Sequence, residues 1–185
     1  TNSIAFSADA ASLLTSGFET ATLWDVRTGV ELRRFHGHSN TVTSVAFSPD
    51  RYSALTASRD GTARLWDLAS GQELRRFEVD SGAMLSSAVF SPDGRSVVAS
   101  GDDMKVRLWD IATGTLTRVI GGVSRGWGSL ASSYDGTFAV ADGGDDSARL
   151  WGISTGMESR TFRGHDAVIT SVAISPDQRL MLTGS

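Results

Sequence analysis

Residues 61–77 of this 185-residue chain read GTARLWDLASGQELRRF, and the same pattern occurs four times in the sequence. The other three copies are ETATLWDVRTGVELRRF at 19–35, MKVRLWDIATGTLTRVI at 104–120 and DSARLWGISTGMESRTF at 146–162. The tryptophans of the four copies are 42, 43 and 42 residues apart, at Trp24, Trp66, Trp109 and Trp151. A period of this length indicates a repeat protein, in which each repeat forms one small unit that packs against its neighbours.

A second motif precedes each tryptophan motif and predicts a tight turn between two strands. It reads VAFSPD at 45–50, AVFSPDG at 88–94 and VAISPD at 172–177, with weaker copies IAFSAD at 4–9 and LASSYDG at 130–136. Proline, aspartate and glycine favour successive turn positions, and the β-branched and apolar residues beside them favour strands. The tryptophan motif adds a third strand, a polar turn that ends in glycine, and a fourth strand. Each repeat is therefore expected to hold four short strands.

The composition narrows the class of protein. Apolar residues make up 40% of the chain, and 20 glycines with three prolines suit frequent turns, which supports an all-β chain with a packed core. The 17 basic residues are scattered and the net charge is −4, so we expect no nucleic-acid partner. No run approaches 18 apolar residues, so we expect no membrane association. The chain has no cysteine and no visible targeting segment, and a cytoplasmic location is the default expectation.

The recurring Trp-Asp pairs, the Ser-Pro-Asp turns and the Gly-His pairs at 37–38 and 164–165 resemble the WD40 family over the whole chain. The resemblance implies an all-β fold of β-propeller blades, each with four antiparallel strands. Four full repeats and one half repeat correspond to about four and a half blades. The expected boundaries are 1–36, 37–79, 80–121 and 122–162 for the full repeats and 163–185 for the half repeat.

The resemblance also implies a buried, hydrogen-bonded tetrad of side chains in each blade. Its members are the His of Gly-His, a Ser or Thr on the second strand, an Asp in the following turn and the Trp of the third strand. The second repeat matches at every position, with His38, Thr56, Asp60 and Trp66. We expect this tetrad to be structural, because a buried indole N–H needs an acceptor and a buried His needs partners on both nitrogens.

The other repeats depart from the tetrad. The first has Glu19 in place of the Asp and no His, and the third and fourth have Ala99 and Ala141 in place of the hydroxyl. The half repeat has His165 and Thr183 and stops before the remaining positions. We therefore expect the third and fourth blades to depend more on packing or on water.

No constellation for catalysis, a cofactor or a metal stands out in the sequence. His36 and His38 form a His-x-His pair, but no third metal ligand is identifiable. Asp103 and Asp145 lie in acidic turns that faintly resemble calcium loops, and we interpret them as tetrad residues instead. The serines lie in repeated turns, and none has the setting of a nucleophile elbow. We therefore expect no catalytic residue, no cofactor and no metal, and interpret the protein as a non-enzyme.

Trp127 is the one tryptophan outside the repeated motif. In the fold that the sequence resembles, the entry to the first strand and the turn after the second strand border the central channel, where partners commonly bind. The candidate partner-binding residues at this rim are Arg59, Asp102, Met104, Arg125 and Trp127. Trp and Arg are prominent among the residues that dominate binding interfaces. The alternative, that Trp127 only fills space against neighbouring blades, stays open.

Ring closure is the main problem that the sequence poses. WD40 rings are usually seven-bladed, and this chain supplies blades for less than two-thirds of such a ring. An open arc would leave an apolar face bare at each end, which folded monomers rarely do. Either the remaining blades belong to a longer protein, or copies close the ring together. We expect a homodimer that completes one ring of eight or nine blades.

The sequence thus predicts a protein–protein interaction scaffold or adaptor without catalysis, whose partner is an unidentified protein or peptide. A second interpretation is a fragment or repeat-amplified propeller with no dedicated ligand, and a propeller hydrolase is a third. The four repeats have visibly diverged, which favours the first interpretation over the second. Fold alone does not fix function, so the identity of the partner stays open.

Overall fold

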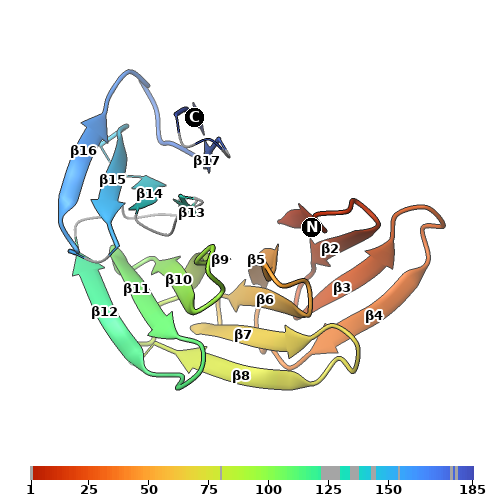
Figure 1. Ribbon diagram of the computed structural model, residues 1–185. Helices are drawn as coiled ribbons and strands as arrows, with labels where there is room; N and C mark the ends of the chain where they lie inside the picture. The colour runs from red at the N-terminus through yellow and green to blue at the C-terminus, as the bar shows by residue number, and fades with distance from the viewer. Residues whose placement is uncertain are drawn as a thin grey trace. The chain divides into compact units, whose positions relative to one another are not determined.

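The computed structural model describes residues 2–79, 81–121, 130–133, 138–142, 145–153, 155–175, 177 and 179–185 (Figure 1). Within these residues the chain forms eighteen β-strands, connected by turns and loops, and no helix. The strands form four antiparallel sheets of four strands and one sheet of two strands. The prediction of an all-β chain built from four-stranded antiparallel sheets is confirmed.

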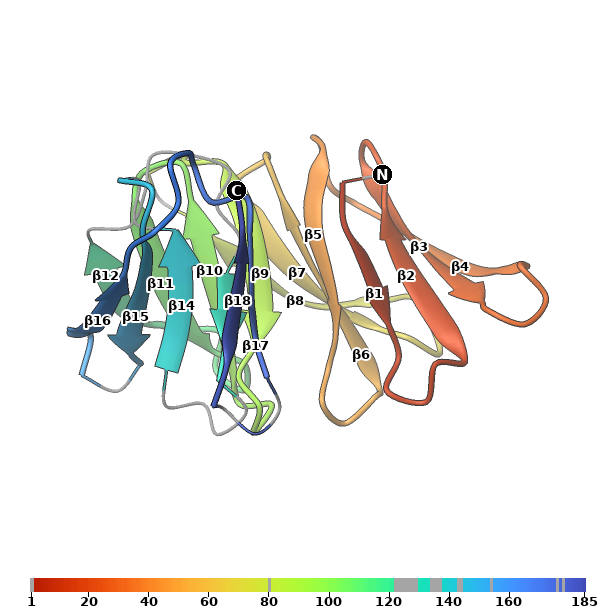
Figure 2. The same ribbon diagram turned by 90° about the horizontal axis from the view of Figure 1, so that it is seen from above.

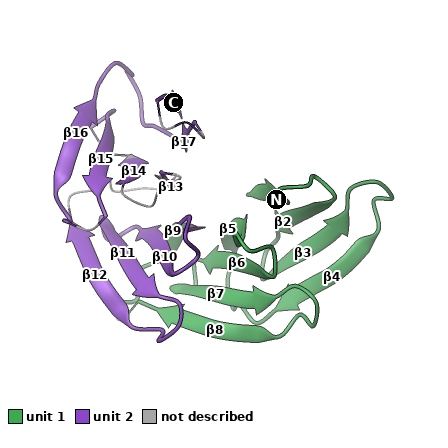
Figure 3. Cartoon of the chain, viewed as in Figure 1, with its two compact units in different colours: residues 1–88 green, residues 89–185 purple. Residues whose placement is uncertain are grey.

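The chain divides into two compact units, residues 1–88 and 89–185, which Figure 3 shows in different colours. The first unit holds two four-stranded sheets, and the boundary falls inside strand β9 (Leu85–Phe90). The second unit holds the rest of the β9 sheet, one further four-stranded sheet and the two-stranded sheet. Each unit therefore contains sheets that can cover one another's apolar faces.

In the first unit the strands follow one another across each sheet in chain order. The first sheet consists of β1 (Ile4–Phe6), β2 (Ser12–Ser16), β3 (Thr20–Asp25) and β4 (Glu31–His36). The second sheet consists of β5 (Val42–Phe47), β6 (Ser53–Ser58), β7 (Thr62–Asp67) and β8 (Glu73–Glu78). Each tryptophan motif is thus the hairpin of the third and fourth strands of its sheet.

The second unit repeats this order. The third sheet consists of β9, β10 (Ser96–Gly101), β11 (Lys105–Asp110) and β12 (Leu116–Gly121). The fourth sheet consists of β13 (Leu130–Ser132), β14 (Phe138–Asp142), β15 (Ala148–Gly152) and β16 (Glu158–Phe162). The two-stranded sheet consists of β17 (Ser171–Ile174) and β18 (Met181–Gly184).

The turn between the third and fourth strands is held by the aspartate that follows the tryptophan. In the second sheet, the Asp67 carboxylate accepts hydrogen bonds from the backbone N–H and the hydroxyl of Ser70, both at 2.6 Å. Gly71 follows in a left-handed conformation, with φ +77°, which disfavours any side chain. The same bonds join Asp25 to Thr28 and Asp110 to Thr113. This local chemistry explains why three of the four motifs carry Asp-x-x-Ser/Thr-Gly.

The turn between the first and second strands depends on a Ser-x-Asp pair. In the second sheet, the Ser48 hydroxyl donates to Asp50 at 2.5 Å and accepts the backbone N–H of Ser53 at 2.9 Å. The same serine–aspartate bond joins Ser7 to Asp9, Ser91 to Asp93, and Ser175 to Asp177. The first sheet makes this turn with Ala8 where the second has proline, so the serine and aspartate, rather than the proline, are the shared requirement.

The two sheets of the first unit lie next to each other (Figure 2), and residues of both form its apolar core. Leu14, Leu23 and Phe35 of the first sheet pack with Val45 and Trp66 of the second. The rings of Phe35 and Trp66 lie with their centroids 5.7 Å apart. Removing apolar surface from water contributes about 25 cal/mol per Å², so this contact is a main source of stability for the pair of sheets.

The second unit packs its sheets in the same way. Trp151 of the fourth sheet packs with Val98, Leu108 and Ile120 of the third. A further cluster joins β14 to the β17–β18 hairpin through Val140 and Val172. In both units, therefore, the tryptophan of one sheet packs against the sheet that precedes it in the chain.

Candidate functional site

The four residues of the expected tetrad lie together in the second sheet. His38, in the loop before β5, places Nδ1 2.8 Å from Asp60 Oδ2 and Nε2 2.7 Å from Thr56 Oγ1. The Trp66 indole donates to the same Thr56 hydroxyl at 2.9 Å. His38, Thr56 and Trp66 are buried, so their polar atoms depend on one another rather than on bulk water.

The chemistry of these groups sets the direction of each hydrogen bond. An indole N–H can only donate, so Thr56 Oγ1 accepts from Trp66 and directs its own proton to His38 Nε2. Nδ1 then carries the ring proton and donates it to Asp60. This chain of hydrogen bonds therefore begins on β7, continues through β6 and the loop before β5, and ends at Asp60 in the turn after β6.

Asp60 ends this chain as an ionised carboxylate. It also accepts hydrogen bonds from the Thr62 hydroxyl at 2.7 Å and from the backbone N–H of Ser39 at 3.1 Å. Burial by itself raises the pKa of Asp60, but the hydrogen bonds from His38 and Thr62 outweigh it and hold that pKa below its ordinary value of 3.8. A carboxylate held ionised by its donors orients His38 well and is a poor proton acceptor at neutral pH.

Arg64 is a buried member of this network that sequence reasoning missed. Its Nη1 lies 2.8 Å from Glu73, its Nη2 lies 3.7 Å from Asp60, and its Nε donates to Thr62 at 3.2 Å. The same strand position pairs with the turn aspartate in two other sheets, as Arg107 with Asp103 and Arg149 with Asp145. The signal that could have found it was an arginine two residues before the tryptophan in three of the four motifs.

In the fourth sheet, two arginines are the charged partners of the turn aspartate. Asp145 lies 3.3 Å from Arg149 and 3.0 Å from Arg163, and it accepts a hydrogen bond from the Ser147 hydroxyl. The Ser147 bond is the largest cause that lowers the pKa of Asp145 to about 2, with help from the two arginines and against a smaller opposing effect of burial. Arginine therefore supplies the positive partner where the His of the tetrad is missing.

The other sheets carry parts of the tetrad. In the first sheet Trp24 donates to Thr15 at 2.8 Å. In the two-stranded sheet His165 Nε2 lies 2.7 Å from Thr183 Oγ1. The Trp151 Nε1 atom is buried and has no hydrogen-bond partner in the part of the chain that the structure describes. Ala141 stands at the strand position that Thr56 occupies in the second sheet, so the fourth sheet lacks the accepting hydroxyl.

Three of the five candidate rim residues are described, and all three lie at turns between second and third strands. Arg59 follows β6 in the first unit and is partly buried. Asp102 and Met104 lie together between β10 and β11 in the second unit, and both are exposed. Arg125 and Trp127 lie outside the described residues. The rim as a single partner-binding surface therefore stays a prediction.

The two histidines of the His-x-His pair have different surroundings. His36 ends β4 and is exposed, whereas His38 is buried in the tetrad. Across the described ranges, no three His, Asp or Glu side chains gather closely enough to hold a metal ion. The described residues also contain no helix long and apolar enough to cross a membrane.

Comparison with known proteins identifies the repeated unit. The family model WD40 (WD domain, G-beta repeat) matches residues 29–67, 71–110 and 156–185, together more than half of the chain. Two of these segments end at the aspartate after a tryptophan, Asp67 and Asp110, and the third covers the β17–β18 hairpin. A comparison with curated proteins finds no match.

Proposed function

Because the chain belongs to the WD40 family (WD domain, G-beta repeat), we propose that it is a protein-interaction scaffold without catalysis. WD40 repeats generally mediate contacts between proteins, and the partner proposed here is an unidentified protein or peptide. A family fold alone does not assign the binding residues, so these are argued from the exposed turns. We propose that the partner is neither a nucleic acid nor a membrane.

The buried network supports a structural role for residues that could otherwise suggest chemistry. His38 uses both of its ring nitrogens, and Thr56 is shared between His38 and Trp66. Asp60 is surrounded by donors that hold it ionised. A general base needs a lone pair within reach of a substrate proton. Since these groups are buried and engaged with one another, we assign binding to the exposed turns.

The exposure and the backbone conformation of Met104 are the observations that best support this assignment. It is 38% exposed and has φ +62°, a left-handed conformation that costs an ordinary side chain about 1–2 kcal/mol. At the same position of the second sheet stands Gly61, with φ +82°. A strained, exposed apolar side chain where glycine would fit without strain is typical of a residue that serves a contact.

Met104→Gly tests this proposal, because it removes the side chain and relieves the backbone together. We expect the variant to be at least as stable as the parent and to lose partner binding, measured by affinity capture on the purified chain and reciprocal capture on the partner. Leu116→Ser, at an exposed apolar position of β12, is the matched control and should retain the partner. Equal capture by the parent and Met104→Gly would move the binding site elsewhere, and capture of no specific partner would favour a propeller without a dedicated ligand.

We further propose that the chain forms a homodimer whose two copies complete one ring of eight or nine blades. Ile4 and Phe6 on β1 are 60% and 58% exposed, and Leu182 on β18 is 75% exposed. Folded proteins rarely leave apolar side chains of this size grouped in water, which supports self-association of the chain. The molar mass of the unmodified chain in solution tests this proposal.

A further inference from the structure

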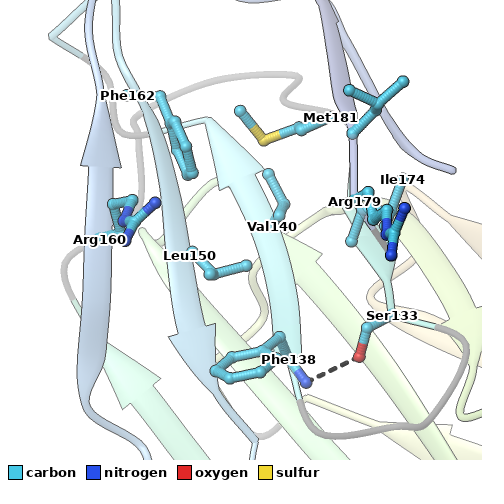
Figure 4. A pocket seen from close by; sticks show the side chains of 10 residues that line it. Ser133, Phe138, Val140, Leu150, Arg160, Phe162, Ile174, Arg179 and Met181 are labelled. Carbon is cyan, nitrogen blue, oxygen red and sulfur yellow. Dashed lines mark hydrogen bonds between the residues drawn. The ribbon is translucent and has the colours of Figure 1, made fainter. Parts of the chain in front are cut away.

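A pocket of about 250 Å³ lies in the second unit, between the β13–β16 sheet and the β17–β18 hairpin (Figure 4). Val140 of β14, Leu150 of β15 and Phe162 of β16 line one side of it, and we call these three residues the apolar wall. Met181 of β18 lines it from the hairpin. An apolar cavity of about 150 Å³ holds a benzene molecule, so this pocket is large enough for one aromatic side chain.

The strand register shows which side chain such a wall receives. The residues of the apolar wall occupy the positions that Leu14, Leu23 and Phe35 occupy in the first sheet. Those three pack against the buried indole of Trp66, which the next sheet supplies. The apolar wall therefore has the pattern of a surface that binds a tryptophan.

The third sheet repeats this relationship within the second unit. Val98, Leu108 and Ile120 stand at the same register positions. They pack against Trp151, which is supplied by the fourth sheet. Two walls of this kind thus each hold a tryptophan, and the apolar wall of the fourth sheet faces a pocket instead.

The β17–β18 hairpin offers the rest of a tryptophan site. In the described part of the chain β18 pairs with β17 alone, whereas the second strand of every four-stranded sheet also pairs with a tryptophan-bearing third strand. Thr183, whose Oγ1 is 2.7 Å from His165, stands at the register position of Thr56. Since Thr56 accepts the Trp66 indole N–H, Thr183 is placed to accept one as well. An open strand edge beside an apolar pocket suits the addition of a strand.

Arg160 indicates which turn should follow a tryptophan that fills the pocket. It lines the pocket and stands at the register position of Arg33. Arg33 Nη1 donates at 2.9 Å to the carbonyl of Ser70, in the turn that follows Trp66. The occupant is therefore expected to carry a tryptophan followed by the same Asp-x-x-Ser/Thr-Gly turn.

Trp24 meets both requirements. Among the described tryptophans it is only partly buried, whereas Trp66, Trp109 and Trp151 are buried. The turn after it has the required form, with the Asp25 carboxylate accepting two hydrogen bonds from Thr28. The β3–β4 hairpin thus carries a tryptophan, Trp24, whose indole is not fully covered.

The β17–β18 hairpin also matches the β1–β2 hairpin, whose strand β2 pairs with β3. Its strand pairs have the register of β1–β2 at a constant offset of 168 residues, with Thr183 in the place of Thr15 and Leu182 in the place of Leu14. Leu14 is fully buried against the second sheet, whereas Leu182 is 75% exposed. His165 is bonded to Thr183 as His38 is bonded to Thr56.

From these matches we propose that β17–β18 of one copy pairs with β3 of a second copy, in place of that copy's own β1–β2. This inference rests on the homodimer proposed above and names the segments that form it. Trp24 of the second copy fills the pocket and donates to Thr183, which completes a donor chain to His165. Arg160 contacts the turn after Trp24, and Leu182 becomes buried where Leu14 was.

A pair of cysteines on different copies tests the exchange directly, because the chain has no cysteine of its own. Ala21 of β3 pairs with Ser16 of β2, and Gly184 of β18 stands at the register position of Ser16. Paired positions of antiparallel strands lie within disulfide reach. We expect an oxidised mixture of the Ala21→Cys chain and the Gly184→Cys chain to give a covalent dimer that neither chain gives alone. Closure of a chain on itself cannot produce this product.

Two control experiments define the contact. The Ser16→Cys/Ala21→Cys double variant should form a disulfide within one chain and run as a monomer, which shows that position 21 accepts a disulfide. Adding Trp24→Ala to the Ala21→Cys chain should lower the cross-linked fraction at least about tenfold, as expected for a central tryptophan anchor. Leu116→Ser in the same chain should leave the cross-linked fraction unchanged.

The outcomes separate this inference from the homodimer on which it rests. A dimeric parent chain with no cross-link in the mixture leaves the homodimer standing and overturns the strand exchange. A monomeric parent chain overturns both. Cross-linking that Trp24→Ala does not reduce overturns the assignment of Trp24 to the pocket.

Discussion

At the scale of single residues, the second sheet depends on the hydroxyl of Thr56. It accepts the indole proton of Trp66 and donates to His38, so one oxygen joins two strands to the loop before them. Leaving a buried donor or acceptor unpaired costs about 1–3 kcal/mol. In the fourth sheet, Ala141 replaces this hydroxyl and Trp151 has no described partner for its N–H. The two tryptophans therefore form a natural comparison.

Trp66→Phe should lower the free energy of unfolding by about 1–3 kcal/mol more than Trp151→Phe does. Both changes remove the same atoms from a buried site, so their packing losses are similar. Only the first removes a hydrogen bond that Thr56 uses. Urea unfolding of the two variants measures the difference. Equal losses would show that the network contributes nothing beyond packing.

The pH dependence of stability should report the Asp60 carboxylate. Its pKa is lowered in the folded state, so between that value and the ordinary 3.8 the unfolded chain binds a proton that the folded chain does not. Its stabilising contribution is therefore complete above about pH 4 and is lost as the pH falls further. Asp60→Asn should flatten the loss of stability between pH 4 and pH 2, measured by urea unfolding. Parallel curves for the parent and the variant would contradict this account.

At the scale of strands and turns, local chemistry made most of the architecture predictable from sequence. The Ser-x-Asp and Asp-x-x-Thr-Gly turns are held by groups a few residues apart, so a short motif contains what determines them. The contact of Arg64 with Asp60 depends on which strand face is buried, and that of Arg33 with Ser70 depends on the next sheet. A local pattern reports neither, which is why sequence reasoning missed both contacts.

The candidate site was predictable only where the sequence resembles a known family. The resemblance to WD40 repeats implied the tetrad of the second repeat, and the structure brings His38, Thr56, Asp60 and Trp66 into one network. Partner binding depends on a molecule that the sequence does not contain. The rim residues, and the repeat boundaries, therefore remain predictions.

Gly71→Ala and Gly29→Ala should differ because only one of them disturbs a neighbouring sheet. Both glycines are left-handed, at φ +77° and +69°, so each change should cost about 1 kcal/mol from the backbone. A methyl at Gly71 would lie 2.7 Å from Arg33 Cδ, whereas nothing lies within 4 Å at Gly29. Losing the Arg33–Ser70 hydrogen bond should add about 0.5–1.5 kcal/mol to the cost of Gly71→Ala alone.

A double-mutant cycle provides the control for this prediction. In an Arg33→Ala background the two alanine variants should lose the same stability, because the contact is already absent. A difference that survives in this background would mean that the Arg33 contact contributes nothing. That result would also weaken the inference from Arg160 that an Asp-x-x-Ser/Thr-Gly turn follows the tryptophan in the pocket.

At the scale of the whole molecule, the first and last strands pose the same problem. β1 exposes Ile4 and Phe6, and β18 exposes Leu182 beside a pocket whose counterparts each hold a tryptophan. The number of repeats was predictable from the period of the sequence. What covers β18 was not, because in our proposal the covering strand β3 and its Trp24 belong to another molecule. The ring and its blade number stay proposals that depend on this association.

The molar mass of the unmodified chain, measured by light scattering over a range of micromolar concentrations, tests the central claim most directly. Self-association through exposed strands predicts a mass of twice 19.6 kDa that falls toward 19.6 kDa on dilution. A constant mass of 19.6 kDa across the whole range would contradict the account.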